Sequence, residues 1–353
     1  MKNPFTPNLL QRLPEPPRRV VLLRAGRIGD FVCATPAFRA LRAALPEAEI
    51  TLITLPMLRT PAERLPSFDQ IVDFPGYPGL AEQFFDARQA THFFQQMQAA
   101  QFDLAVQMQG SGVYSNPFTL MLGARSTAGC IREGDPPGCL DAALPFPSGH
   151  EIERVLGLAT FLGASAQGRT PEFALRPEDH AAAAALLAEA EPPFIGLHPA
   201  ARDLTRRWAP ERFVAVGQAL QERYGGTLLV LGEPGSAVAE TVTQQLGGRG
   251  RNLAGQTSLV TLGGVIAQLA LLVTNDSGPA HIAYALGTPT VTIFGSADPQ
   301  RYGPPAHGPF TALVHPVPCR PCDYTTCPIG YPCLEHVTVE EVLAAAHAVV
   351  GSR

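Results

Sequence analysis

The chain has 353 residues, of which 46% are apolar and 16% are charged, and its formal net charge is −5. This length predicts about two domains, each large enough to bury a core, and the apolar content excludes an intrinsically disordered chain. A mildly acidic chain is not a general nucleic-acid binder, because phosphate contacts require a basic surface.

The start of the chain lacks the apolar run of a signal peptide, since residues 1–19 contain five prolines. The longest apolar stretch, 265–273, is shorter than the roughly 20 residues that cross a bilayer. We therefore expect a cytoplasmic protein whose seven cysteines are reduced.

Short aliphatic runs bounded by turn-forming residues recur along the chain, and each predicts a buried strand. They lie at 20–23, 50–54, 71–74, 104–106, 194–197, 228–231, 271–274 and 290–294. Amphipathic patterns between them, at 37–45 and 213–223 for example, predict helices. Continuous apolar strands that alternate with helices are typical of parallel sheets covered on both faces. We predict two Rossmann-like α/β domains.

The region 163–193 separates the two sets of runs and contains an alanine-rich helical stretch at 178–191. We place the boundary after Gly168, which gives domains of residues 1–168 and 169–353. A final helix is predicted at 338–350, and the sequence leaves open which domain it packs on.

The first polar motif, residues 24–30, follows the first predicted strand and contains Arg24, Gly26, Arg27, Gly29 and Asp30. Ligands bind at the carboxyl ends of such strands, and glycines allow a tight turn or a close approach. A third glycine would be needed for a dinucleotide fingerprint. Asp30 has two interpretations: a cap of the next helix, or a general base in a cleft beside an arginine that contacts an anionic group.

The second polar motif, residues 198–210, follows the first strand of the second domain. It contains three arginines and the only tryptophan, Trp208, and it predicts a clamp for a diphosphate. The alternative is a solvated charged loop with Trp208 packed on the following helix.

The third polar motif, residues 275–281, places Asp276, Ser277 and Gly278 before an apolar helix. Backbone N–H groups at a helix start favour a phosphate. Asp276 is expected to hold the turn or to accept from a sugar hydroxyl. The alternatives are an ordinary capped helix and, for His281, a structural histidine.

Four cysteines lie within fifteen positions near the end of the chain: Cys319, Cys322, Cys327 and Cys333. Their density fits a structural zinc or iron–sulfur site, although the later gaps are not a zinc-ribbon spacing. The alternative is reduced thiols in a proline-rich loop. The chain has no H-E-x-x-H and no D-x-D between apolar strands, so the sequence does not demand a catalytic metal.

Taken together, the G-R-I-G-D of 26–30, the 198–210 loop and the D-S-G-P-A-H of 276–281 resemble glycosyltransferase family 9, the ADP-heptose:lipopolysaccharide heptosyltransferases. The resemblance runs from about Val20 to Val350. It implies a GT-B fold, in which two Rossmann-like domains with parallel sheets face a central cleft. The N-terminal domain would bind the acceptor and the C-terminal domain the nucleotide-sugar.

The activity implied is inverting, metal-independent transfer of a sugar from an ADP-sugar, ADP-heptose first, to a lipid-linked acceptor of the lipopolysaccharide-core type, with no cofactor. Asp30 matches the catalytic base, in an acceptor-side loop with Arg24, Gly26, Arg27 and Gly29. The expected donor-binding residues are Arg206, Trp208, Glu233, Asp276, Ser277, Gly278 and His281. Arg206 stands where the family usually has a lysine, so a planar fork replaces a point charge.

Such an acceptor implies peripheral contact with the cytoplasmic face of the inner membrane. Phe84, Phe85, Phe93 and Phe94 with Arg88 are our candidates for touching lipid or acceptor, and aromatic packing inside the N-terminal domain is the alternative. Other functions remain open: a GT-B transferase with another nucleotide-sugar, or a non-catalytic nucleotide- or sugar-binding protein. A nicotinamide-dependent oxidoreductase would need a G-x-G-x-x-G after a first strand, and neither domain has one.

Overall fold

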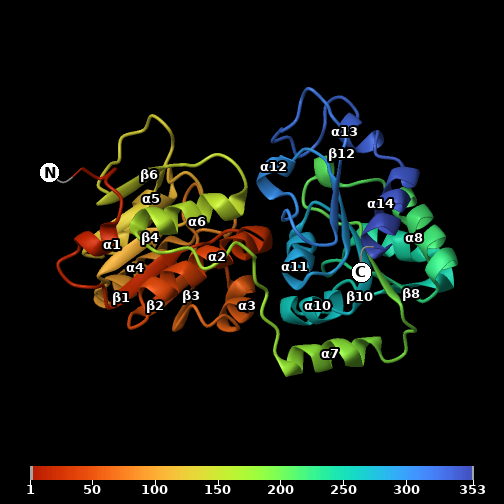
Figure 1. Ribbon diagram of the computed structural model, residues 1–353, viewed down its shortest axis with the longest axis horizontal. Coiled ribbons are helices and arrows are strands. Elements are labelled where there is room, and N and C mark those ends of the chain that lie inside the picture. Colours follow the sequence, from red (N-terminus) through yellow and green to blue (C-terminus); the bar gives the residue numbers. More distant parts are fainter. Residues whose placement is uncertain (1–2, 352–353) are drawn as a thin grey trace. The chain divides into compact units, whose positions relative to one another are not determined.

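The structure is a computed structural model that describes residues 3–351 (Figure 1). The chain divides into two compact units between Ala174 and Leu175. Residues 169–174, which the sequence analysis gave to the second domain, belong to the first unit. They are held there because Glu172 N donates to Thr35 Oγ1 at 2.8 Å and Phe173 is buried.

The first unit is built on one parallel sheet of six strands in the order β3-β2-β1-β4-β5-β6. The strands are β1 (Arg19–Leu23), β2 (Glu49–Thr54), β3 (Gln70–Asp73), β4 (Leu104–Gln107), β5 (Ser126–Ile131) and β6 (Ala142–Pro145). Its helices are α1 (Leu9–Arg12), α2 (Ile28–Ala44), α3 (Arg59–Glu63), α4 (Ala87–Ala99), α5 (Ser115–Met121) and α6 (Glu151–Leu162), with a 3-10 turn at Pro56–Leu58. Helices α2 and α6 pack side by side (Figure 1), which brings residues far apart in sequence together.

The second unit repeats this plan. Its six parallel strands lie in the order β12-β11-β10-β7-β8-β9. If β7 is taken as its first strand and the list is read from β9, this is the strand order of the first sheet. The strands are β7 (Phe194–His198), β8 (Thr227–Val230), β9 (Gly250–Asn252), β10 (Leu269–Asn275), β11 (Thr290–Phe294) and β12 (Phe310–Val314). In both sheets the strand order reverses between the first and the fourth strand, where doubly wound sheets bind ligands.

The helices of the second unit are α7 (Pro177–Leu187), α8 (Pro210–Tyr224), α9 (Ala237–Leu246), α10 (Leu259–Ile266), α11 (Gly278–Leu286), α12 (Pro299–Tyr302), α13 (Pro332–Glu335) and α14 (Val339–Gly351), with 3-10 turns at Leu204–Arg206 and Gly247–Arg249. The C-terminal helix α14 packs against α8 and the sheet of this unit (Figure 1), which settles the question that the sequence left open. No helix within residues 3–351 combines the length and the apolar character that a membrane span requires.

The prediction of two parallel α/β sheets is confirmed, and every predicted aliphatic run forms a strand. Four strands were missed: β5, β6, β9 and β12. They lie toward the edges of the two sheets, and their sequences lack a continuous aliphatic run. β9, for example, is Gly-Arg-Asn and none of its residues is fully buried.

Candidate active site

Asp30 lies in the first turn of α2, just beyond the carboxyl end of β1. Its Oδ2 accepts a hydrogen bond from Arg27 N at 3.0 Å, so this carboxylate caps the helix. Its side chain is nevertheless 24% exposed. A Cβ at position 26 would lie 2.7 Å from the Asp30 Cβ, so the close approach of the chain to Asp30 requires Gly26. Gly29 lies in the same helical turn.

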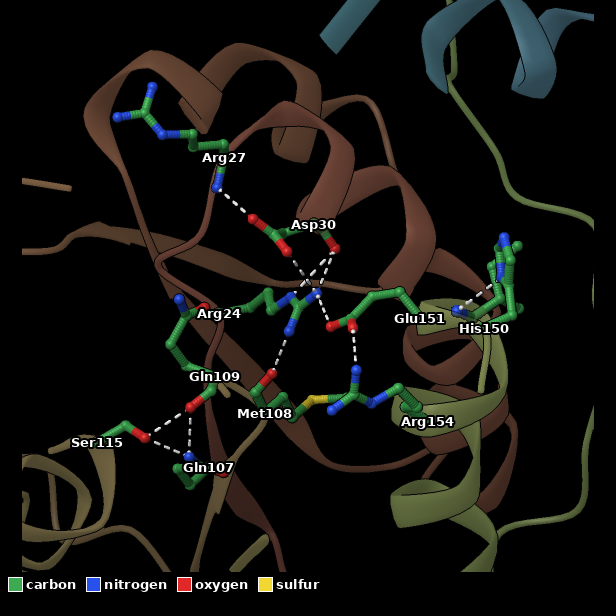
Figure 2. Close-up of polar contacts among 11 residues, drawn as sticks. Arg24, Arg27, Asp30, Gln107, Met108, Gln109, Ser115, His150, Glu151 and Arg154 are labelled. Atoms are coloured by element: carbon green, nitrogen blue, oxygen red, sulfur yellow. Dashed lines mark hydrogen bonds and ion pairs between the residues drawn. The ribbon is translucent and has the colours of Figure 1, made fainter. Parts of the chain in front are cut away.

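Arg24 lies under Asp30 and holds its main chain in place. Nε and Nη2 of Arg24 donate to the Asp30 carbonyl at 3.1 and 2.8 Å, and Nη1 donates to the Met108 carbonyl at 2.5 Å. Nη2 also lies 3.5 Å from Asp30 Oδ1. The Arg24 side chain is 1% exposed, so of the two arginines expected to contact an anionic group Arg24 is not available for it, and it holds Asp30 instead. The side chain of Arg27 is exposed and points away from this group (Figure 2).

Two charged residues that the sequence analysis missed complete this group, and both come from α6 (Figure 2). Arg24 Nη2 donates to Glu151 Oε1 at 3.0 Å, and Glu151 is 1% exposed. Glu151 Oε2 lies 3.5 Å from Arg154 Nη1, and the Arg154 guanidinium stacks 3.8 Å from the centre of the Phe146 ring. The one available signal was a pair of charges three residues apart on an otherwise apolar helix face.

In the second unit, Asp276 directly follows β10 and is 4% exposed. Burial raises the pKa of its carboxyl to about 6, although the positive charge of Arg206 acts to lower it. Arg206 Nη1 lies 3.2 Å from Asp276 Oδ2, and the Arg206 side chain is 37% exposed. The structure therefore brings together two residues that the sequence placed in separate motifs.

Ser277 is the N-cap of α11, but its hydroxyl does not bond to the helix backbone. Instead, Ser277 Oγ lies 3.1 Å from His198 Nδ1, at the end of the neighbouring strand β7. Burial lowers the pKa of His198 to about 4, so the imidazole is neutral at pH 7. Gly278 starts the helix and is partly exposed, which leaves the start of α11 accessible to a ligand.

Trp208 does not reach a ligand, and the expectation that it binds the donor is wrong. Its side chain is 0% exposed, its Nε1 donates to the Val337 carbonyl at 2.9 Å, and its ring packs edge-on against Phe213 of α8. The packing alternative is correct, because the indole is the largest apolar group of this loop. The Trp208 N–H donates to Asn275 Oδ1 at 3.0 Å and ties the loop to the end of β10.

The last two expected donor residues lie in different surroundings. His281 is 6% exposed, with its ring edge-on to Tyr284 and Tyr302, which fits the structural alternative. Glu233 is exposed in the turn that follows β8, at the carboxyl edge of the sheet.

The cysteine-rich segment was open to two interpretations, a structural metal site or reduced thiols. Within residues 3–351, no group of three or more His, Cys, Asp or Glu side chains is arranged to hold a metal ion. Cys319 is exposed, Cys322 and Cys327 are half-buried and Cys333 is buried. The segment instead supports the loop of Arg206, because Leu204 N donates to the Thr325 carbonyl at 3.0 Å and Thr205 Oγ1 to the Tyr324 carbonyl at 2.6 Å.

The aromatic residues after β3 fall into two groups. Phe93 and Phe94 are buried in a ring cluster with Phe118, so they are core residues rather than a lipid contact. Phe84 is 86% exposed and Phe85 38% exposed.

Two doubly wound parallel sheets, each with polar residues at its strand-order reversal, are the architecture of the GT-B fold class. The family model of glycosyltransferase family 9 (heptosyltransferase) matches residues 90–331. The chain therefore belongs to glycosyltransferase family 9, and the resemblance seen in the sequence is confirmed.

Individual relatives agree with this family. The chain is 22% identical to the lipopolysaccharide core heptosyltransferase OpsX of Haemophilus influenzae, over 82% of each chain. It is 29% identical to lipooligosaccharide heptosyltransferase 2 of Campylobacter jejuni over 43% of this chain, and this match spans 50% of that relative's length. Among solved structures, the ADP-heptose lps heptosyltransferase II of Escherichia coli superposes with a TM-score of 0.77 at 20% identity, over 95% of this chain and 99% of that one.

Proposed function

We propose that the protein transfers heptose from ADP-heptose to a lipopolysaccharide-core acceptor, with inversion at the anomeric carbon and without a metal ion. The names of its relatives support the sugar and the acceptor class. The observation that carries the proposal is Asp30: an accessible carboxylate at the carboxyl end of β1, fixed by Arg27 N and by Arg24. The first unit would bind the acceptor and the second the donor.

In the proposed reaction, Asp30 takes the proton of the acceptor hydroxyl while that oxygen attacks the anomeric carbon. The bond from this carbon to the diphosphate breaks on the opposite face, and ADP leaves with the electron pair. Arg206 and the N-terminus of α11 would neutralise the developing negative charge, so protein groups supply what a metal supplies elsewhere. Glu233, in the turn after β8, is our candidate for a contact to the ribose.

Product formation by the purified protein tests this proposal. ADP-heptose, UDP-sugars and GDP-sugars are each offered with heptose-deficient lipopolysaccharide, with and without EDTA. We expect ADP release only from ADP-heptose, no loss with EDTA, and a product of inverted configuration by NMR. Turnover of a UDP- or GDP-sugar instead would keep the transferase and discard ADP-heptose. ADP binding without any turnover would favour a non-catalytic binding protein.

The role of Asp30 is tested with Asp30→Asn against Glu47→Gln, which makes the same carboxylate-to-amide change in the exposed loop before β2. We expect Asp30→Asn to lower kcat by about 10²–10⁴-fold, the usual contribution of a general base. Its affinity for ADP should stay within about 2-fold of wild type, and Glu47→Gln should match wild type in both respects. An Asp30→Asn variant with wild-type kcat would remove Asp30 from the mechanism.

A lipid-linked acceptor also implies contact with the cytoplasmic face of the inner membrane, and the exposed Phe84 is our candidate for it. Flotation with vesicles of anionic lipid should carry the protein upward, and Phe84→Ser should reduce that fraction. A wild-type protein that stays wholly at the bottom of the gradient would contradict membrane contact.

A further inference from the structure

Arg24, Asp30, Glu151 and Arg154 form a chain of alternating charges that ends at Asp30 (Figure 2). The two central members, Arg24 and Glu151, are each 1% exposed, and Arg154 is 10% exposed. Charges so far from water interact strongly with one another. Two positive and two negative charges make the group neutral as a whole.

We propose that Glu151 and Arg154 are positioning residues for Asp30, which act through Arg24 to set how readily the Asp30 carboxylate takes up a proton. The proposal rests on the proposed role of Asp30 as the base. The proposal does not require Glu151 or Arg154 to contact the substrate. Glu151 bonds to Arg24, which in turn holds the Asp30 carbonyl and lies 3.5 Å from its carboxylate.

The physical reason is the sharing of one positive charge between two carboxylates. Arg24 Nη2 lies 3.0 Å from Glu151 Oε1 and 3.5 Å from Asp30 Oδ1. If Glu151 loses its charge, the field of Arg24 acts on Asp30 alone, and the Asp30 carboxylate becomes a weaker proton acceptor. If Arg154 loses its charge, Glu151 is no longer offset on its far side, and its negative charge makes Asp30 a stronger proton acceptor.

Arg27 and His150 are the other titratable side chains labelled near this group in Figure 2. Arg27 on the helix cap directs its side chain into solvent, and His150 at the start of α6 uses Nδ1 to accept from Ile152 N at 3.2 Å. Cys130 of β5 also interacts with this group. Burial is the main reason that the pKa of its thiol is raised to about 12, and the negative charge of Glu151 adds to this effect. Cys130 is therefore a neutral thiol throughout the working pH range.

The test is the pH dependence of kcat/KM for Glu151→Gln and Arg154→Gln in the full-length protein. The acidic limb should move by about one pH unit to lower pH in Glu151→Gln, and by a smaller step to higher pH in Arg154→Gln. The control, Glu153→Gln, lies on the same helix and removes a carboxylate paired with the exposed Arg169, so its profile should coincide with wild type.

The opposite signs distinguish tuning from mere structural support. The proposal is overturned if both variants lose activity while their acidic limbs stay in place. It is also overturned if the acidic limbs of the two variants move in the same direction. Thermal unfolding checks that each variant folds, and Arg154→Gln carries the test alone if Glu151→Gln does not fold. Asp30→Asn separates the two levels: an active Asp30→Asn removes the proposed base, whereas an inactive one with unmoved limbs removes only the role of Glu151 and Arg154.

Discussion

Two carboxylates, Asp30 and Asp276, lie at the strand-order reversals of two sheets with the same strand order. Asp30 follows the first strand of its sheet and is 24% exposed, whereas Asp276 follows the fourth strand of its sheet and is 4% exposed. Asp30 belongs to a balanced group of four charges, and Asp276 faces Arg206.

The difference shows that the position of a carboxylate in a doubly wound sheet does not fix what it can do. Burial has raised the pKa of Asp276 to about 6, which is costly for a group that is to stay charged. Asp30 keeps access to solvent, and its capping bond and Arg24 fix its direction. The surroundings of Asp276 suit ligand binding next to a cation, and those of Asp30 suit proton transfer.

The largest effect should come from Trp208, which ties the 198–210 loop to the end of β10 near Asp276. Trp208→Ala removes a fully buried indole that packs on Phe213 and bonds to the Val337 carbonyl. We expect the second unit to lose about 3–5 kcal/mol of unfolding free energy, measured by urea denaturation. A variant of unchanged stability with weakened ADP binding would restore Trp208 as a donor contact.

A smaller effect is expected from Arg206, the cation that pairs with Asp276. Arg206→Ala should weaken ADP binding by about 10–100-fold in calorimetry, because a charge-assisted contact to the diphosphate is lost. Arg206→Lys should keep much of the affinity, since it retains the charge. Arg202→Ala is the matched control: this arginine of the same loop pairs with its neighbour Asp203, at 3.8 Å, and should leave the affinity unchanged. Equal losses in Arg206→Ala and Arg202→Ala, with Arg206→Lys at wild-type affinity, would assign the effect to the net charge of the loop.

An effect of similar size concerns stability and pH at Asp276. Its pKa is about 6 in the folded protein, whereas an ordinary Asp, as in the unfolded chain, has a pKa of 3.8. Between these pH values the folded state therefore binds more protons than the unfolded state. The contribution of Asp276 to stability therefore falls as the pH rises from about 4 to 6. Asp276→Asn removes this loss, and we expect its stability relative to wild type to increase by about 1–3 kcal/mol between pH 4 and pH 7.

Thermal and urea unfolding of both proteins across this pH range measure the difference. His198, whose pKa is lowered to about 4, acts in the opposite direction but is present in both proteins and cancels. A constant difference between the two proteins would mean that folding does not change the pKa of Asp276. ADP binding should weaken in the same variant, so function and stability would change in opposite directions.

Sequence reasoning located the two carboxylates because each follows an aliphatic run, and the carboxyl ends of buried parallel strands can be recognised from local pattern alone. It also gave both sheets, since eight of the strands are continuous aliphatic segments. It failed where burial or pairing depends on distant residues. Glu151 contacts Arg24 across 127 positions, and Arg206 contacts Asp276 across 70.

The sequence by itself thus determined the fold class, the family and the positions of the polar turns, because these depend on periodicity and on short motifs. Only the tertiary structure decided which charges meet. It buried Trp208 and Arg24, which the sequence had offered to ligands, and it left the four cysteines without the arrangement of a metal site. The physical reason is that the packing of α6 on α2, and of the 198–210 loop on β10, sets the distances on which electrostatic interactions depend.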